Sequence, residues 1–124
     1  YHCMLMMARQ NLMFGKHPIL EGNYVKEIRW GYIDDVLEPQ LCDTAHRLKI
    51  ILTHAPPDII RQRCVARAAP HDKEKLASDE NWNALLREQP PVPPEIERYA
   101  HIKVDTSAPL SERQWADIVD FLRN

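Results

Sequence analysis

LKIILTHAPPDIIRQRCVAR, residues 48–67, is the most informative segment of the chain. It opens with an apolar run rich in β-branched residues, which predicts a strand over residues 48–53 that is buried on both faces of a parallel sheet. Pro56 and Pro57 end this strand because proline cannot donate to a sheet ladder. Pro57 suits the first turn of a helix, where Asp58 complements the helix dipole. The segment therefore predicts a buried strand, a tight turn and a helix.

The predicted helix carries arginine side chains just beyond the end of the strand. Arg63 and Arg67 lie one turn apart on one side of this helix. In open α/β sheets the carboxyl ends of the strands face the ligand crevice. Guanidinium groups bind phosphate there through planar, bidentate donors with a permanent charge. We therefore expect Arg63 and Arg67 to bind phosphate; a solvated helix face is the alternative.

Composition limits the classes of partner. The chain has 124 residues, enough for one domain over residues 1–124, and its net charge of -2 gives no general basic field for nucleic acid. Three cysteines without a CxxC pair argue against a disulfide framework or structural zinc, and predict small core residues in a reducing compartment. No apolar run reaches the roughly 18 residues of a membrane span, and no signal peptide is evident. We expect a cytoplasmic protein with no membrane partner.

Helices and strands alternate along the chain. Beside residues 48–67, the sequence predicts helices over residues 2–14 and 25–37, strands over 17–21 and 101–105, an exposed lid near 68–77, a helix capped by Ser78 or Asp79, and a closing helix. In the closing helix Ser111 and Gln114 form a capping box, and the predicted buried stripe consists of Trp115, Ile118, Val119 and Leu122. This order predicts a three-layer α/β/α domain with a mostly parallel sheet.

Four pieces of the chain, in order, resemble the P-loop kinases, and within them the zeta-toxin-like, gluconate-kinase-like and AAA-labelled ATP-binding proteins. The pieces are ARQNLMFGKHPILEG at residues 8–22, residues 48–67, the lid and helix at 71–88, and KVDTS at 103–107. The resemblance implies a P-loop kinase-like fold that is incomplete at its N-terminus, because the sequence holds no GxxxxGK[ST] loop to cradle phosphate. It favours the C-terminal part of a longer protein over a degenerate relative.

The resemblance implies an ATP-dependent kinase that transfers the γ-phosphoryl group to a small hydroxylated acceptor, with ATP and Mg²⁺ as cofactors. Arg63 would lie near the adenine and Arg67 would reach the phosphates. The segment Asp105, Thr106 and Ser107 would border the adenine. The equally supported alternative is that these residues only form a turn and the entry to the next helix. Most of the magnesium ligands would belong to the missing segment, and the residues present predict no metal site.

Acceptor binding is assigned by the same resemblance to the region after residue 20. Glu21 matches the acidic residue that orients or deprotonates the acceptor hydroxyl or helps to hold magnesium. Asn23, Tyr24 and Arg29 are candidates for the acceptor pocket, although ordinary turn and helix chemistry is the simpler interpretation of them. The rival function is a non-catalytic nucleotide-binding or interaction module that needs a partner segment, supplied by a missing N-terminal part or a second chain.

Overall fold

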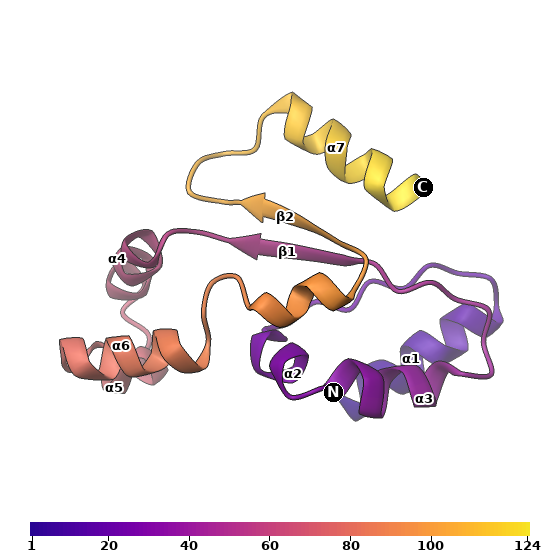
Figure 1. Cartoon of the computed structure of the whole chain (residues 1–124), viewed down its shortest axis with the longest axis horizontal. Helices are drawn as coiled ribbons and strands as arrows, with labels where there is room; N and C mark the ends of the chain where they lie inside the picture. The colour runs from indigo at the N-terminus through magenta and orange to yellow at the C-terminus, as the bar shows by residue number, and fades with distance from the viewer. The chain divides into compact units, whose positions relative to one another are not determined.

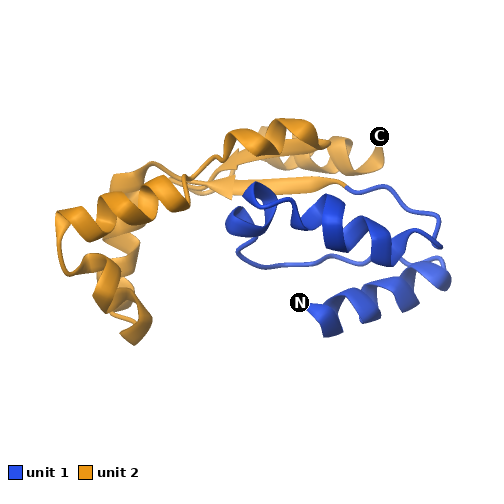
Figure 2. Cartoon of the chain, turned by 60° about the horizontal axis from the view of Figure 1, so that its bottom comes forward, with its two compact units in different colours: residues 1–48 blue, residues 49–124 orange.

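The computed structural model describes all 124 residues, which form seven α-helices and a parallel sheet of two strands (Figure 1). The chain divides into two compact units, Tyr1–Leu48 and Lys49–Asn124 (Figure 2). Each unit is described by itself. None of the helices is long and apolar enough to cross a bilayer.

The first unit is helical. Its helices are α1 (His2–Met13), α2 (Val25–Arg29), a π-helix at Ile33–Leu37 and α3 (Glu38–Leu41). Leu5 of α1 packs with Leu37 and Leu41 to form the core, and the partly buried side chains around it are Leu12, Leu20, Tyr32, Val36 and Leu48. The buried residues of α1 are Leu5 and Ala8, so one face of this helix is covered.

Three predictions for this unit are wrong. Residues 17–21 form no strand, and Ile19 is exposed, because a two-residue apolar core finds no neighbouring strand with which to pair. The helix predicted over 25–37 is interrupted after α2, since Gly31 takes a left-handed conformation with φ +79°. Cys3 and Cys42 are exposed and not core residues as predicted, whereas Cys64, in the second unit, is buried as predicted.

The second unit contains the sheet. Strand β1 (Ile50–His54) pairs in parallel with β2 (His101–Asp105), from Ile50 opposite His101 to His54 opposite Asp105. The two strands therefore end at the same edge, as Figure 1 shows. Helix α4 (Pro57–Arg67) follows β1 and begins with proline, as the sequence predicts.

Helix α7 (Glu112–Arg123) closes the unit and begins with the predicted capping box. The backbone N–H of Gln114 donates to Ser111 Oγ at 3.2 Å, and the Gln114 side chain accepts from the Ser111 N–H at 2.9 Å. At the other end Lys49 Nζ donates to the carbonyl of Phe121 at 2.6 Å. This bond ties the last turn of α7 to the residue before β1 and satisfies a carbonyl that the helix leaves unpaired.

Burial in this unit is one-sided. Leu52 is 7% exposed but Ile51 is 40% exposed, so the prediction of a strand buried on both faces is wrong. In α7 only Ile118 of the predicted stripe is buried, and the exposed members are Trp115, Val119 and Leu122. Alternating burial of this kind is typical of a sheet with one covered face.

Short helices fill the segment between α4 and β2. They are the 3₁₀ turn Pro70–Asp72, α5 (Lys73–Leu76), α6 (Asp79–Glu88) and the 3₁₀ turn Pro94–Arg98. Ser78 caps α6 by accepting from the N–H of Asn81 at 3.1 Å, as predicted. The predicted lid at 68–77 is not an open loop, because it contains α5 and a buried carboxylate, Asp72.

The one-sided burial of β1 yields a direct test. Leu52→Ala should lower the free energy of unfolding by about 2–5 kcal/mol, because it removes buried methyl groups and leaves a cavity. Ile51→Ala, one residue away, should cost less than about 1 kcal/mol since its side chain already contacts solvent. Urea unfolding followed by circular dichroism measures both, and equal losses would mean that both faces of β1 are covered.

Candidate functional site

The carboxyl ends of β1 and β2 are joined by a compact turn. The carbonyl of His54 accepts hydrogen bonds from the backbone N–H of Thr106 at 2.8 Å and from its hydroxyl at 3.0 Å. The side chain of Asp105 accepts from the N–H of Ser107 at 2.8 Å, which closes a local turn. Thr106 is therefore fixed at the end of the ladder by both its backbone and its side chain.

Arg63 of α4 reaches this turn. Its Nη1 donates to the Thr106 hydroxyl at 3.2 Å and its Nη2 donates to the Thr106 carbonyl. The guanidinium uses part of its five donors in this way, and the exposed side chain leaves the others open to a ligand. The structure thus brings four of the predicted residues together, namely Arg63, Asp105, Thr106 and Ser107.

We call Arg63, Asp105, Thr106 and Ser107 the strand-end cluster. It holds one positive charge, that of Arg63, and one nearby negative charge, that of Asp105. Hydrogen bonds from the hydroxyl and N–H of Ser107, together with the charges of His54 and Arg63, hold the pKa of Asp105 below its usual range. Asp105 is therefore ionised at neutral pH. The groups that Arg63 touches are uncharged, and an anionic ligand forms stronger, charge-assisted hydrogen bonds than a carbonyl does. The arrangement suits reversible binding of a phosphate group.

Arg67 has a different partner. Its Nε and Nη2 donate to Oδ2 of Asp72 at 2.9 and 2.6 Å, and Lys75 Nζ lies 2.6 Å from the other oxygen. Asp72 is only 1% exposed, while the Arg67 side chain is 55% exposed. Hydrogen bonding from Lys75, and next from Arg67, holds the pKa of Asp72 below its usual range against the opposing effect of burial.

The role of Asp72 is not visible in the sequence. It lies in a charged run, PHDKEK, of the kind that is usually solvated, and its pairing with Arg67 depends on the left-handed Ala68 that reverses the chain after α4. The Arg67 side chain is therefore held by a neighbouring carboxylate and not by the turn at Thr106. A ligand phosphate at Arg67 must compete with a charged partner.

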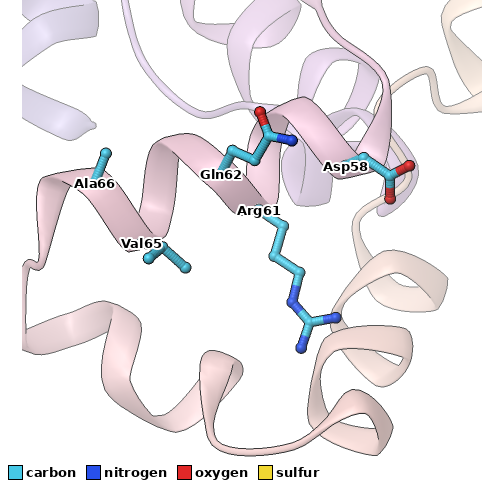
Figure 3. Close-up of a pocket in the computed structure, with 5 residues that line it drawn as sticks. All are labelled: Asp58, Arg61, Gln62, Val65 and Ala66. Carbon is cyan, nitrogen blue, oxygen red and sulfur yellow. The ribbon is translucent and has the colours of Figure 1, made fainter.

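A hollow of about 510 Å³ lies along another part of α4 and is lined by Asp58, Arg61, Gln62, Val65 and Ala66 (Figure 3). Arg61 is already engaged there, with its Nη2 2.7 Å from Asp79 and its guanidinium 5.7 Å from the ring centre of Trp82. None of the predicted site residues lines this hollow. We therefore locate the candidate chemistry at the strand ends and not in the hollow.

In the first unit, three of the predicted acceptor residues, Glu21, Asn23 and Tyr24, lie in the turn into α2, and Arg29 is the last residue of that helix. Glu21 and Asn23 are exposed, while Tyr24 and Arg29 are partly buried. The Asn23 carbonyl accepts from the Tyr1 hydroxyl at 3.2 Å, and the Tyr1 and Tyr24 rings lie 4.8 Å apart. Tyr24 therefore belongs to an aromatic group that the spacing of these residues does not reveal.

No group of three or more His, Cys, Asp or Glu side chains is arranged to hold a metal ion. The magnesium that the resemblance implies needs oxygen ligands, chiefly carboxylates and phosphate oxygens. The carboxylates of this chain do not gather into such a set, so its residues do not fit a magnesium site of their own.

The chain matches no family model, no curated protein and no solved structure.

Asp72 gives a prediction for stability. Its pKa is lowered in the folded state, so its contribution to stability is fully present above the ordinary aspartate pKa of about 3.9 and is lost as the pH falls below that value. Asp72→Asn should lower the melting temperature by several degrees at pH 7, with a difference that shrinks in acid.

Asp79→Asn is the matched control, because Asp79 also pairs with an arginine but is 82% exposed. An exposed ion pair contributes little, so this variant should melt close to the parent. Differential scanning calorimetry measures the melting temperature of both variants from about pH 3 to about pH 7. This range extends roughly one unit below and three units above the ordinary aspartate pKa. Equal melting temperatures for Asp72→Asn and the parent at pH 7 would show that the Arg67–Asp72–Lys75 cluster does not stabilise the fold.

Proposed function

We propose that the chain is part of an ATP-dependent small-molecule kinase with a P-loop kinase-like, three-layer fold, and that its second unit binds the nucleotide. The observation that carries the proposal is the placement of Arg63 at the carboxyl ends of two parallel strands. In open α/β sheets this edge is where ligands bind. An accessible guanidinium held there by neutral partners favours a phosphate-bearing ligand over a neutral one.

Within this proposal Arg63 binds the nucleotide and the turn at Asp105, Thr106 and Ser107 borders it. The backbone of that turn is fixed by the bonds to His54, which keeps the site in one geometry before the ligand arrives. Arg67 joins the phosphates only when they displace the Asp72 carboxylate. The chain's contribution is therefore positioning and charge stabilisation, which are the main components of catalysis in phosphoryl transfer.

The acceptor is assigned to the first unit. Glu21 orients the acceptor hydroxyl as general base, and its exposed side chain is accessible to a ligand. Asn23 and Tyr24, which follow it in the same turn, and Arg29 at the end of α2 bind the rest of the acceptor.

The second candidate is a non-catalytic nucleotide-binding or interaction module that takes a partner segment. It is favoured by the apolar side chains that unit Lys49–Asn124 leaves in solvent, namely Ile51, Trp115, Val119 and Leu122. Nucleotide binding without any phosphoryl transfer by the natural protein supports this module over the kinase.

Arg63→Gln should weaken ATP binding by about tenfold, because a hydrogen bond to a charged group contributes roughly 1.5–3 kcal/mol. Arg61→Gln on the same helix is the control, and it should leave the affinity unchanged since Arg61 already pairs with Asp79. Titration calorimetry on the chain measures the three dissociation constants. Equal affinity of the parent and Arg63→Gln, or no ATP binding by the parent, would contradict the proposed nucleotide site.

Glu21→Gln keeps the shape of the side chain and removes its charge. In the natural protein this change should reduce phosphoryl transfer at least about a hundredfold, as expected for a general base, while ATP affinity changes little. Transfer of labelled phosphate from ATP to a panel of small alcohols provides the measurement. Equal turnover of the two proteins would mean that Glu21 is only a turn residue.

A further inference from the structure

Three tyrosines gather around one carboxylate in the first unit. The Tyr1 ring lies 4.8 Å from the Tyr24 ring and 5.9 Å from the Tyr32 ring, at interplanar angles of 34° and 52°. Glu27 lies on the first turn of α2, and its charge, after burial, raises the pKa of the Tyr1 phenol. We call these four residues the tyrosine cluster.

The tyrosine cluster contains an unsatisfied acceptor. Oε2 of Glu27 is buried and has no hydrogen-bond partner. A buried carboxylate oxygen without a donor costs free energy, so such a group in a folded protein calls for a ligand or an ordered water that supplies the donor. Because Glu27 lies beside three aromatic rings, the surroundings of its unsatisfied oxygen limit which hydrogen-bond donor can bind there.

The charges of the cluster favour a cation. Burial, followed by the negative charge of Glu27, raises the pKa of both Tyr1 and Tyr32, and burial is also the main cause that raises the pKa of Tyr24. The three phenols therefore stay neutral at physiological pH and present electron-rich ring faces. Ring faces attract ammonium groups, and a carboxylate adds a full opposite charge.

We propose that the tyrosine cluster binds an organic ammonium group, with its N–H donating to Oε2 of Glu27 and its charge lying against the tyrosine rings. A protonated primary amine suits the site better than a quaternary ammonium, because the unsatisfied carboxylate oxygen needs an N–H donor. Tyr1 is 49% exposed, so its ring is the one that can move aside to admit the ligand.

The cluster shares Tyr24 with the acceptor residues assigned above. If the proposed kinase function holds, on which this step rests, the acceptor is an amino alcohol: its ammonium group binds the tyrosine cluster and its hydroxyl is phosphorylated. Binding of the cation itself needs neither ATP nor transfer, so the two proposals are tested apart.

The experiment titrates the chain with ethanolamine and records the tyrosine ring signals by NMR, without nucleotide. Ethylene glycol, which replaces the amine by a second hydroxyl, is the neutral control, and tetramethylammonium tests the need for an N–H donor. Ethanolamine should shift the ring signals of Tyr1, Tyr24 and Tyr32 saturably, tetramethylammonium should bind more weakly, and ethylene glycol should shift none of them.

Two variants assign the site. Glu27→Gln should weaken ethanolamine binding about tenfold, since it removes a charge-assisted hydrogen bond, and Tyr24→Leu should weaken it about threefold by removing one ring face. Glu80→Gln changes an exposed carboxylate on α6 and should leave the affinity unchanged. The proposal is overturned if ethanolamine fails to shift the rings, if ethylene glycol shifts them equally, or if a folded Glu27→Gln or Tyr24→Leu binds as tightly as the parent.

ATP binding or phosphoryl transfer by the parent is a separate result. If the parent protein binds ethanolamine but neither binds ATP nor transfers phosphate, the cation site exists in a protein that is not a kinase. The reverse result would leave a kinase whose acceptor carries no amine.

Discussion

The carbonyl oxygen of His54 is the point on which the candidate site depends. It accepts both the N–H and the hydroxyl of Thr106, and so joins the end of β1 to the residue after β2. These bonds hold the turn that Arg63 of α4 contacts. Because Arg63 binds the same threonine, the bonds to His54 also determine where the guanidinium lies.

Helix α4 distributes its arginines among different partners. Arg63 contacts neutral groups at the strand ends, Arg67 is held by the buried carboxylate of Asp72, and Arg61 pairs with Asp79 at the edge of an open hollow. An anion that approaches this helix therefore meets one guanidinium with neutral partners, that of Arg63, and two that must first leave a carboxylate. This difference in partners, more than the number of positive charges, makes Arg63 the stronger candidate for ligand binding.

Much of the second unit could be predicted from the sequence, because its signals are local. The β-branched run before Pro56, the proline that opens α4, and the caps at Ser78 and Ser111 each depend on a few adjacent residues, and the structure contains all of them. The meeting of Arg63 with Asp105, Thr106 and Ser107 follows from parallel pairing of the strands.

Other features depend on contacts that no local pattern contains. Residues 17–21 lack a strand to pair with, and the exposure of Ile51 and Trp115 reflects how little of the unit lies over them. Asp72 and the tyrosine cluster are built from residues whose proximity arises only after the chain turns, at Ala68 in one case and around α2 in the other.

The most direct test of this account is the register of the two strands in solution. NMR should show nuclear Overhauser effects between β1 and β2 that place Thr53 beside Val104 in a parallel ladder, with a Thr106 amide that exchanges slowly because it donates to His54. Cross-strand effects in another register, or a Thr106 amide that exchanges as fast as in an unstructured peptide, would contradict the account, because Arg63 would then have no fixed turn to bind.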